Sequence, residues 1–205
     1  MPLPRPLFRR SPASLRHGPA CALAAACLCL APAAPAQNLP PPAAVPQVLP
    51  ANVVAANAVN AALRKGDAAG ALKAAEDGLR DSPKDAQLRF LRAVVLGDLG
   101  RTDEAVAALE ALNAEFPELP EPYNNLAVIR AGQGKYAEAE HLLQQALAAQ
   151  AGYVTARENL GDLYVSMAIA AYEQAGRLDP ANAAVKRKLA LARELGGRLH
   201  GAHGG

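Results

Sequence analysis

The chain has 205 residues, enough for one domain with flanking segments, and 51% of them are apolar. Aromatic residues make up 4% and tryptophan is absent, which favours closely packed, alanine-rich helices over a β-sandwich. The formal net charge of +2 comes from residues 1–36, which hold four arginines and no acid, whereas the remainder carries a net charge of −2. Such a near-neutral balance of interspersed charges gives no electrostatic footprint for nucleic acid, so no nucleic-acid partner is expected.

Residues 1–36 have the layout of a secretory signal peptide. A basic segment is followed by the apolar run Ala20–Leu30 and then by small residues that end with Ala34-Pro35-Ala36. The apolar run is well short of the roughly 20 residues that span a bilayer, so a membrane span is not expected. We therefore expect export to the periplasm, with cleavage after Ala36.

Two other readings of this leader stay open. Arg9-Arg10 could form a twin-arginine signal, although Ser11-Pro12 follows where an apolar residue is usual, and Cys27 could be a lipoprotein acylation site. All three cysteines lie in the leader, so the mature chain would have neither disulfides nor cysteine-based zinc sites. The segment 37–51, with five prolines in fifteen residues, is expected to be a mobile, extended spacer.

From residue 52 onward the sequence repeats with a period of 34 residues. Glycines expected to end first helices and alanines expected where two helices cross both recur at this spacing, and two prolines close second helices. These positions are Gly66, Gly100 and Gly134; Ala71, Ala105 and Ala139; and Pro83 and Pro117.

The best-defined copy is Tyr123–Ala151, which reads as two amphipathic helices joined at a glycine. With its period of 34, the chain resembles the tetratricopeptide repeat family. The resemblance implies an all-α, right-handed α-solenoid over residues 52–195 that binds other proteins. The expected units are 52–85, 86–119 and 120–153, followed by a fused fourth unit, 154–180, and a capping helix, 181–195.

Four local features carry expectations of their own. Gly78 lies inside a helix, so the first unit should be the least stable, and Thr102 should cap the second helix of unit two. Arg92 and Arg130 stand where the family prefers apolar residues, so either their stems lie along the helix or the register slips by one there.

The fourth unit lacks the usual turn, because Val165-Ser166-Met167 contains no helix breaker. We expect one continuous helix from about Val154 to Leu178, with a very tight turn at 165–167 as the alternative. A charged amphipathic helix, Ala181–Leu195, should then cover the open end of the solenoid, and residues 196–205 should be a frayed tail.

The sequence shows no set of residues suited to catalysis, and no metal or cofactor site is expected. His141 is interpreted as a helix-surface residue, while His200 and His203 stand in a glycine-rich tail without a carboxylate partner. Neither a phosphate-binding loop motif nor a zinc-protease motif is present.

The family resemblance places the first helices along a concave groove, and the corresponding positions hold no lysine or arginine with which to clamp a C-terminal carboxylate. Amides that can pair with the backbone of an extended peptide lie beside apolar residues and acids. The candidate groove residues are Asn57, Asn60, Phe90, Val94, Asn124, Asn125, Val128, Glu158, Asn159 and Asp162. We expect a non-enzymatic adaptor or assembly factor that binds a partner polypeptide there. The alternative is a self-associating scaffold of the cell envelope, and an enzyme or ligand-transport accessory is least favoured.

Overall fold

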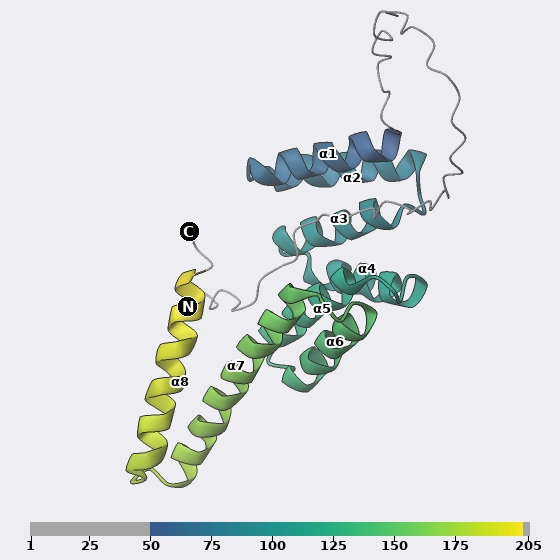
Figure 1. The fold of residues 1–205 in the computed structure, drawn as a ribbon. Coiled ribbons are helices and arrows are strands. Elements are labelled where there is room, and N and C mark those ends of the chain that lie inside the picture. The colour runs from purple at the N-terminus through teal and green to yellow at the C-terminus, as the bar shows by residue number, and fades with distance from the viewer. Residues whose placement is uncertain (1–49, 203–205) are drawn as a thin grey trace, which may run out of the picture.

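The computed structural model describes the backbone of residues 50–202, and its side chains through residue 198. The signal-peptide prediction for residues 1–36 and most of the spacer therefore lie outside the described residues. Within them, eight helices follow one another without a strand and form a stack of hairpins, seen from blue to yellow in Figure 1. The helices are α1 (Ala51–Arg64), α2 (Ala68–Asp81), α3 (Ala86–Asp98), α4 (Thr102–Glu115), α5 (Pro120–Gly132), α6 (Tyr136–Ala149), α7 (Val154–Leu178) and α8 (Ala183–Ala202).

The three repeat glycines end the first helix of each hairpin, as the 34-residue spacing predicts. Gly66, Gly100 and Gly134 have φ angles of 72°, 75° and 75°, in the left-handed region that favours glycine. The three repeat alanines, Ala71, Ala105 and Ala139, are fully buried in α2, α4 and α6. The predicted roles of the glycines and alanines in the three units are therefore confirmed.

The two arginines at apolar positions are accommodated by ion pairing. The side chain of Arg130 is only 17% exposed, and its guanidinium lies 2.7 Å from Glu110 and 3.2 Å from Glu138. Arg92 is 31% exposed and its Nε lies 3.4 Å from Glu76. Each stem is thus partly buried while its charged end reaches an acid at the surface.

The core of the solenoid is shared between successive hairpins. One cluster joins α1 and α2 to Leu88, Leu91 and Val95 of α3, and the next joins α3 and α4 to Leu126 of α5. A third cluster joins α5 and α6 to the first part of α7 through Ala156. Because each hairpin completes its core with the first helix of the next, the units support one another as in other linear repeats.

The fourth unit is one uninterrupted helix, as expected. α7 runs from Val154 to Leu178 and passes through Ser166 without a break, so the tight-turn alternative is wrong. The first half of this helix packs on α5 and α6, and the second half packs on α8.

The prediction of a frayed tail from residue 196 is wrong, because α8 continues to Ala202. Gly196 is buried where the two last helices approach closely, and a Cβ built on it would lie 3.2 Å from Cδ1 of Ile169. An ion pair of 2.6 Å between Arg198 and Glu194 lies one turn apart on the same helix. This packing outweighs the low helix propensity of the two adjacent glycines.

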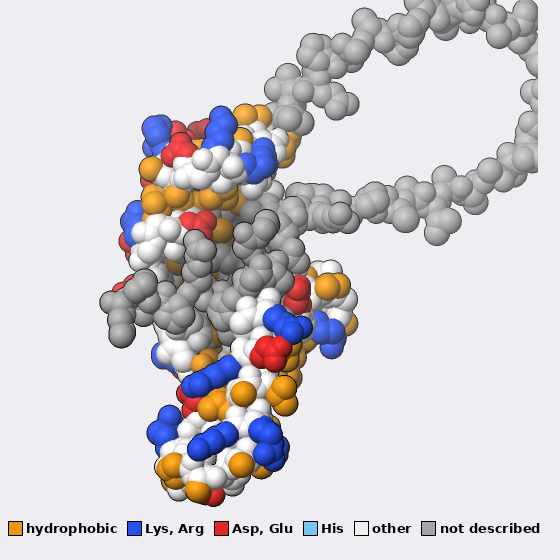
Figure 2. Space-filling view, turned by 90° about the vertical axis from the view of Figure 1, so that its left-hand side faces the viewer, with side chains coloured by type: hydrophobic (Ala, Val, Ile, Leu, Met, Phe, Trp, Pro, Cys, Tyr) orange, Lys and Arg blue, Asp and Glu red, His pale blue; other side chains and the backbone are white. Residues whose placement is uncertain are grey.

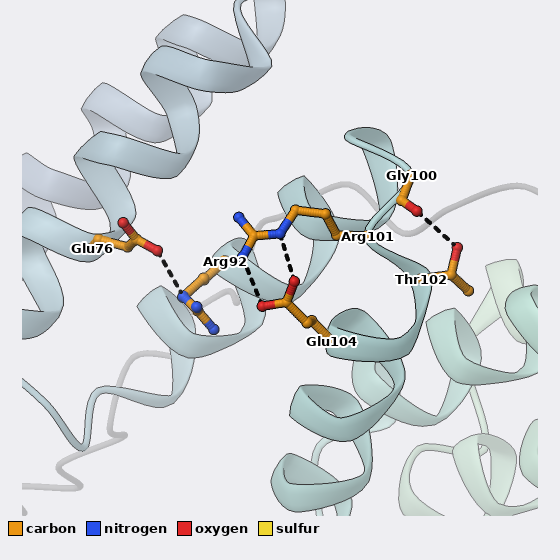
Figure 3. Close-up of polar contacts among 6 residues, drawn as sticks. All are labelled: Glu76, Arg92, Gly100, Arg101, Thr102 and Glu104. Atoms are coloured by element: carbon orange, nitrogen blue, oxygen red, sulfur yellow. Dashed lines mark hydrogen bonds and ion pairs between the residues drawn. The ribbon is translucent and has the colours of Figure 1, made fainter.

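The predicted cap at Thr102 is also wrong. α4 begins at Thr102 itself, and the preceding Arg101 occupies the cap position without a side-chain capping bond. The Thr102 hydroxyl instead donates a long hydrogen bond of 3.5 Å to the carbonyl of Gly100 (Figure 3). Side-chain caps do occur at Asp67 and Asp85, which accept backbone hydrogen bonds of 2.8 and 2.7 Å at the starts of α2 and α3.

The basic residues of the last helix are exposed, as expected from its amphipathic pattern. Figure 2 shows Lys and Arg side chains gathered with hydrophobic ones at the end of the molecule formed by α7 and α8. They include Lys186, Arg187, Lys188 and Arg193. One of them, Lys188, lies 6.0 Å from the ring centre of Tyr172 on α7.

Candidate functional site

The candidate binding surface lies on the first helices, α1, α3, α5 and the first half of α7, and we call it the first-helix face. Its ten predicted residues come from four elements. α1 packs on α3 and α5 packs on α7, and a shared core cluster links Phe90 of α3 to Leu126 of α5. Asn57 and Glu158 are exposed, while Asn60 and Val94 are half-buried. Of the ten predicted residues, these four have side chains that reach the surface.

Two of the predicted amides lie in the interior and bind each other. Asn124 on α5 and Asn159 on α7 are both fully buried, and Nδ2 of Asn159 donates a hydrogen bond of 2.8 Å to Oδ1 of Asn124. A buried amide must be hydrogen-bonded to be tolerated, so this bond fixes how the third and fourth units meet. Asn124 and Asn159 therefore shape the first-helix face by holding its helices together.

The remaining predicted residues are also buried. Phe90, 1% exposed, packs in the core cluster of α3, α4 and α5, so its side chain belongs to the core. Val128 lies in the cluster of α5, α6 and α7. Nδ2 of Asn125 donates a hydrogen bond of 2.9 Å to the carbonyl of Glu121, and the carbonyl of Asp162 accepts one of 3.1 Å from Ser166.

Glu121 adds a half-buried carboxyl group on the same helix as Asn124 and Asn125. Its Oε2 atom is buried and has no hydrogen-bond partner, and burial raises the pKa of this carboxyl above its ordinary value. Burial, and after it the negative charge of Glu121, raises the pKa of the Tyr153 hydroxyl. Around α5 and the start of α7 the electrostatic environment therefore disfavours further negative charge.

Surface ion pairs involve α2, α3 and the start of α4. Glu76 on α2 meets Arg92, and Arg101 holds Glu104 through two hydrogen bonds of 2.6 and 2.7 Å (Figure 3). The hydrogen bond from Arg101 is the main cause that lowers the pKa of the Glu104 carboxyl. Exposed pairs of this kind contribute little to stability, and we assign them no role in a site.

The described residues show no arrangement for metal chemistry. In residues 50–202, no group of three or more His, Cys, Asp or Glu side chains could hold a metal ion. The same part of the chain contains no helix that is both long and apolar enough to cross a bilayer.

The stacked hairpins agree with what comparison of the sequence shows. A family model described as "Tetratricopeptide repeat" matches residues 57–120 and 124–166. The chain belongs to the tetratricopeptide repeat family. Members of this family are in general protein-interaction modules built from the helix-turn-helix units seen here.

Similar proteins support the same assignment. A curated relative, "TPR repeat-containing protein YvcD" of Bacillus subtilis (strain 168), is 36% identical over 88 residues, which is 42% of this chain and 18% of the relative. This chain therefore spans less than a fifth of the length of that tetratricopeptide repeat protein.

Solved structures share the fold at low sequence identity. The first tetratricopeptide repeat domain of human RPAP3 aligns with a TM-score of 0.53 at 20% identity, over 60% of this chain and 95% of that one. The first such domain of Spaghetti (RPAP3), bound to the HSP90 peptide SRMEEVD, aligns with a TM-score of 0.52 at 18% identity, over 57% and 93%. At these identities the likeness shows the tetratricopeptide repeat fold alone.

Proposed function

We propose that this tetratricopeptide repeat protein is a periplasmic adaptor or assembly factor, and that it holds an extended segment of a partner polypeptide on its first-helix face. The observation that carries the proposal is that Asn57 and Glu158 are exposed and that Asn60 and Val94 are half-buried on the first helices of the array. Amides can bind a peptide backbone through paired donors and acceptors, and Val94 offers an apolar contact.

The charge of this face indicates which segment would fit. Glu121, Glu158 and Asp162 are acids on α5 and α7, and the predicted groove positions hold no lysine or arginine. The related domain of Spaghetti is described with an HSP90 peptide ending in Glu-Glu-Val-Asp, whose acids would meet like charges here. We therefore expect this chain to select a neutral or basic segment and to reject acidic C-terminal peptides.

Photo-crosslinking in cells tests this proposal. A crosslinking amino acid is placed at Asn57 or Glu158, which are exposed and do not support the core, and in the control at Ala107, which is exposed on α4. Capture of the same partner from the first two positions and not from Ala107 supports the proposal. Equal capture from all three positions, or none from the first two, overturns it.

The periplasmic address is tested separately. If the leader directs export as expected, the mature protein begins at Gln37. Because an N-terminal glutamine cyclises readily to pyroglutamate, which blocks Edman degradation, mass spectrometry of the N-terminal peptide of the protein from the cell envelope is used, and it should find residue 37 first. A start at Met1 would refute export, and a lipid-modified Cys27 at the N-terminus would place the protein at a membrane surface.

Exposed apolar residues on the last hairpin, formed by the second half of α7 and by α8, favour a second candidate function, self-association into a scaffold. Leu191 and Leu195 of α8 are 66% and 48% exposed, and they line a groove of about 320 Å³ together with Val165, Ala168 and Tyr172. Apolar residues exposed side by side are typical of contact surfaces. Analytical ultracentrifugation of the full chain and of Leu191→Glu tests this function. A concentration-dependent dimer that is lost in the variant supports it, and a monomer at all concentrations excludes it.

A further inference from the structure

A pocket of about 440 Å³ opens between α4, α5 and α6, and none of its lining residues belongs to the predicted groove set. Its volume lies within the range of small-ligand sites. Leu126 and Leu142 provide apolar surface, and Tyr123, Asn113 and His141 provide polar groups. The pocket therefore joins an apolar lining with a few polar atoms, which is the usual composition of a binding site.

One polar atom in this lining lacks a partner. Oδ1 of Asn113 is buried and accepts no hydrogen bond, although the backbone carbonyl of the same residue accepts one of 3.3 Å from the Tyr123 hydroxyl. A buried acceptor without a donor costs roughly 1–3 kcal/mol. Because this oxygen has almost no exposed surface although the residue is half-buried, a donor on a ligand reaches it once the Asn113 side chain turns toward the pocket.

The charged groups of the lining are already compensated. Arg130 binds Glu110 and Glu138, and Lys135 lies 3.6 Å from the second oxygen of Glu138. A charged ligand would therefore find no unpaired arginine, lysine or glutamate among these groups. The missing group is thus a neutral hydrogen-bond donor on an apolar body.

The repeat supplies an internal comparison for these residues. Between the first two units, the positions 34 residues earlier hold Leu79 in place of Asn113 and Arg92 in place of Leu126. The Arg92 guanidinium reaches Glu76 there (Figure 3), whereas the shorter Leu126 leaves space at the pocket. The positions 34 residues later hold Leu147 and Leu160, so among the three equivalent positions only residue 113 is an amide, and the buried acceptor is particular to the junction of units two and three.

We propose that this pocket binds a phenol, namely the tyrosine side chain of a partner polypeptide. The ring would rest on Leu126 and Leu142, and its hydroxyl would donate to Oδ1 of Asn113. A phenylalanine side chain fills the same volume but leaves that acceptor unpaired, so the pocket should distinguish the two. The site is separate from the first-helix face and does not depend on the function proposed for it.

The test uses the full-length chain and four small probes in NMR titrations of its leucine methyl groups. N-acetyl-tyrosinamide is expected to bind about three- to tenfold more tightly than N-acetyl-phenylalaninamide, the effect of one net hydrogen bond. Asn113→Leu should abolish this preference while both probes still bind. Because leucine already stands at the equivalent position 79, the fold should accept the change. The control Gln144→Leu alters an exposed amide on α6 outside the pocket and should leave the preference intact.

Each other result has a defined meaning. Equal affinity for the two amides, absence of binding, or a preference that survives Asn113→Leu overturns the proposal. The free phenol p-cresol and its hydroxyl-free analogue toluene distinguish the source of the ligand. If p-cresol binds and N-acetyl-tyrosinamide does not, the pocket is closed to a polypeptide and the assignment to a partner's tyrosine is overturned.

Discussion

Replacing Gly78 by alanine tests whether the first hairpin is held by close backbone approach. A Cβ built on Gly78 of α2 would lie 2.5 Å from Cβ of Ala55 on α1 and 3.0 Å from Cδ1 of Leu88 on α3. Carbon atoms in contact prefer separations of about 3.5–4.0 Å, so the two helices would have to move apart. Overpacking of this kind costs about 1–3 kcal/mol.

Substitution of a second glycine serves as the control that separates the cost of overpacking from the gain in helix propensity. Gly161 lies inside α7, and nothing would lie within 4 Å of a Cβ built on it. Both substitutions gain up to about 1 kcal/mol because alanine is the better helix former. We therefore expect Gly161→Ala to stabilise the protein, and Gly78→Ala to be less stable than Gly161→Ala by about 1–3 kcal/mol.

Urea denaturation followed by circular dichroism measures the difference, and hydrogen exchange of the amides of α1 and α2 localises it. Exchange should accelerate in this hairpin for Gly78→Ala alone. The same measurement on the unaltered chain tests whether the first unit is the least stable of the array. If Gly78→Ala stabilises the protein as much as Gly161→Ala does, the close approach of α1 and α2 does not constrain position 78.

Three further predictions concern single side chains. Burial raises the pKa of Glu121 above its ordinary value of 4.5, so the folded state binds this proton more tightly than the unfolded state and loses stability as the pH rises through the raised pKa. Glu121→Gln should therefore be more stable than the parent protein at pH 7. Urea denaturation at about pH 4 should show that this gain in stability is reduced or lost. Gly134→Ala forces an L side chain to a φ of 75° and should lower the free energy of unfolding by about 1 kcal/mol, whereas Gly132→Ala, in open space at a helix end, should not. Removing the buried bond with Asn159→Ala should cost about 1 kcal/mol or more, and the double variant with Asn124→Ala should be less destabilised than the sum of the two single variants.

Sequence alone could predict the positions where the backbone geometry accepts few residue types and where those positions recur at a fixed spacing. A left-handed turn favours glycine, and a close helix crossing favours alanine, so Gly100 and Ala105 could be placed before the structure was known. The uninterrupted helix α7 was predictable for the opposite reason, since no breaker stands between Val165 and Met167.

The features that could not be predicted depend on which residues meet across helices. Gly196 resembles a helix breaker in the sequence, and only its position against Ile169 explains why α8 continues through it. Asn124 and Asn159 were both expected to line a groove, but they are 35 residues apart and their mutual bond appears only when α5 packs on α7. His141 was interpreted correctly as a surface residue, yet its place at the rim of the pocket is a property of three helices together.

The fused helix makes the last hairpin different from the first three. In the first three units the second helix folds back on the first through a glycine turn, so each hairpin offers the next a surface of the same kind. α7 has no such turn, and α8 packs along its second half, where Gly176 approaches Val185 and Arg193 pairs with Glu173. Apolar residues of this last hairpin, among them Leu191, are exposed on α8. For that reason a second copy of the chain, if one binds, should dock on the last hairpin and leave the first-helix face open for the partner polypeptide.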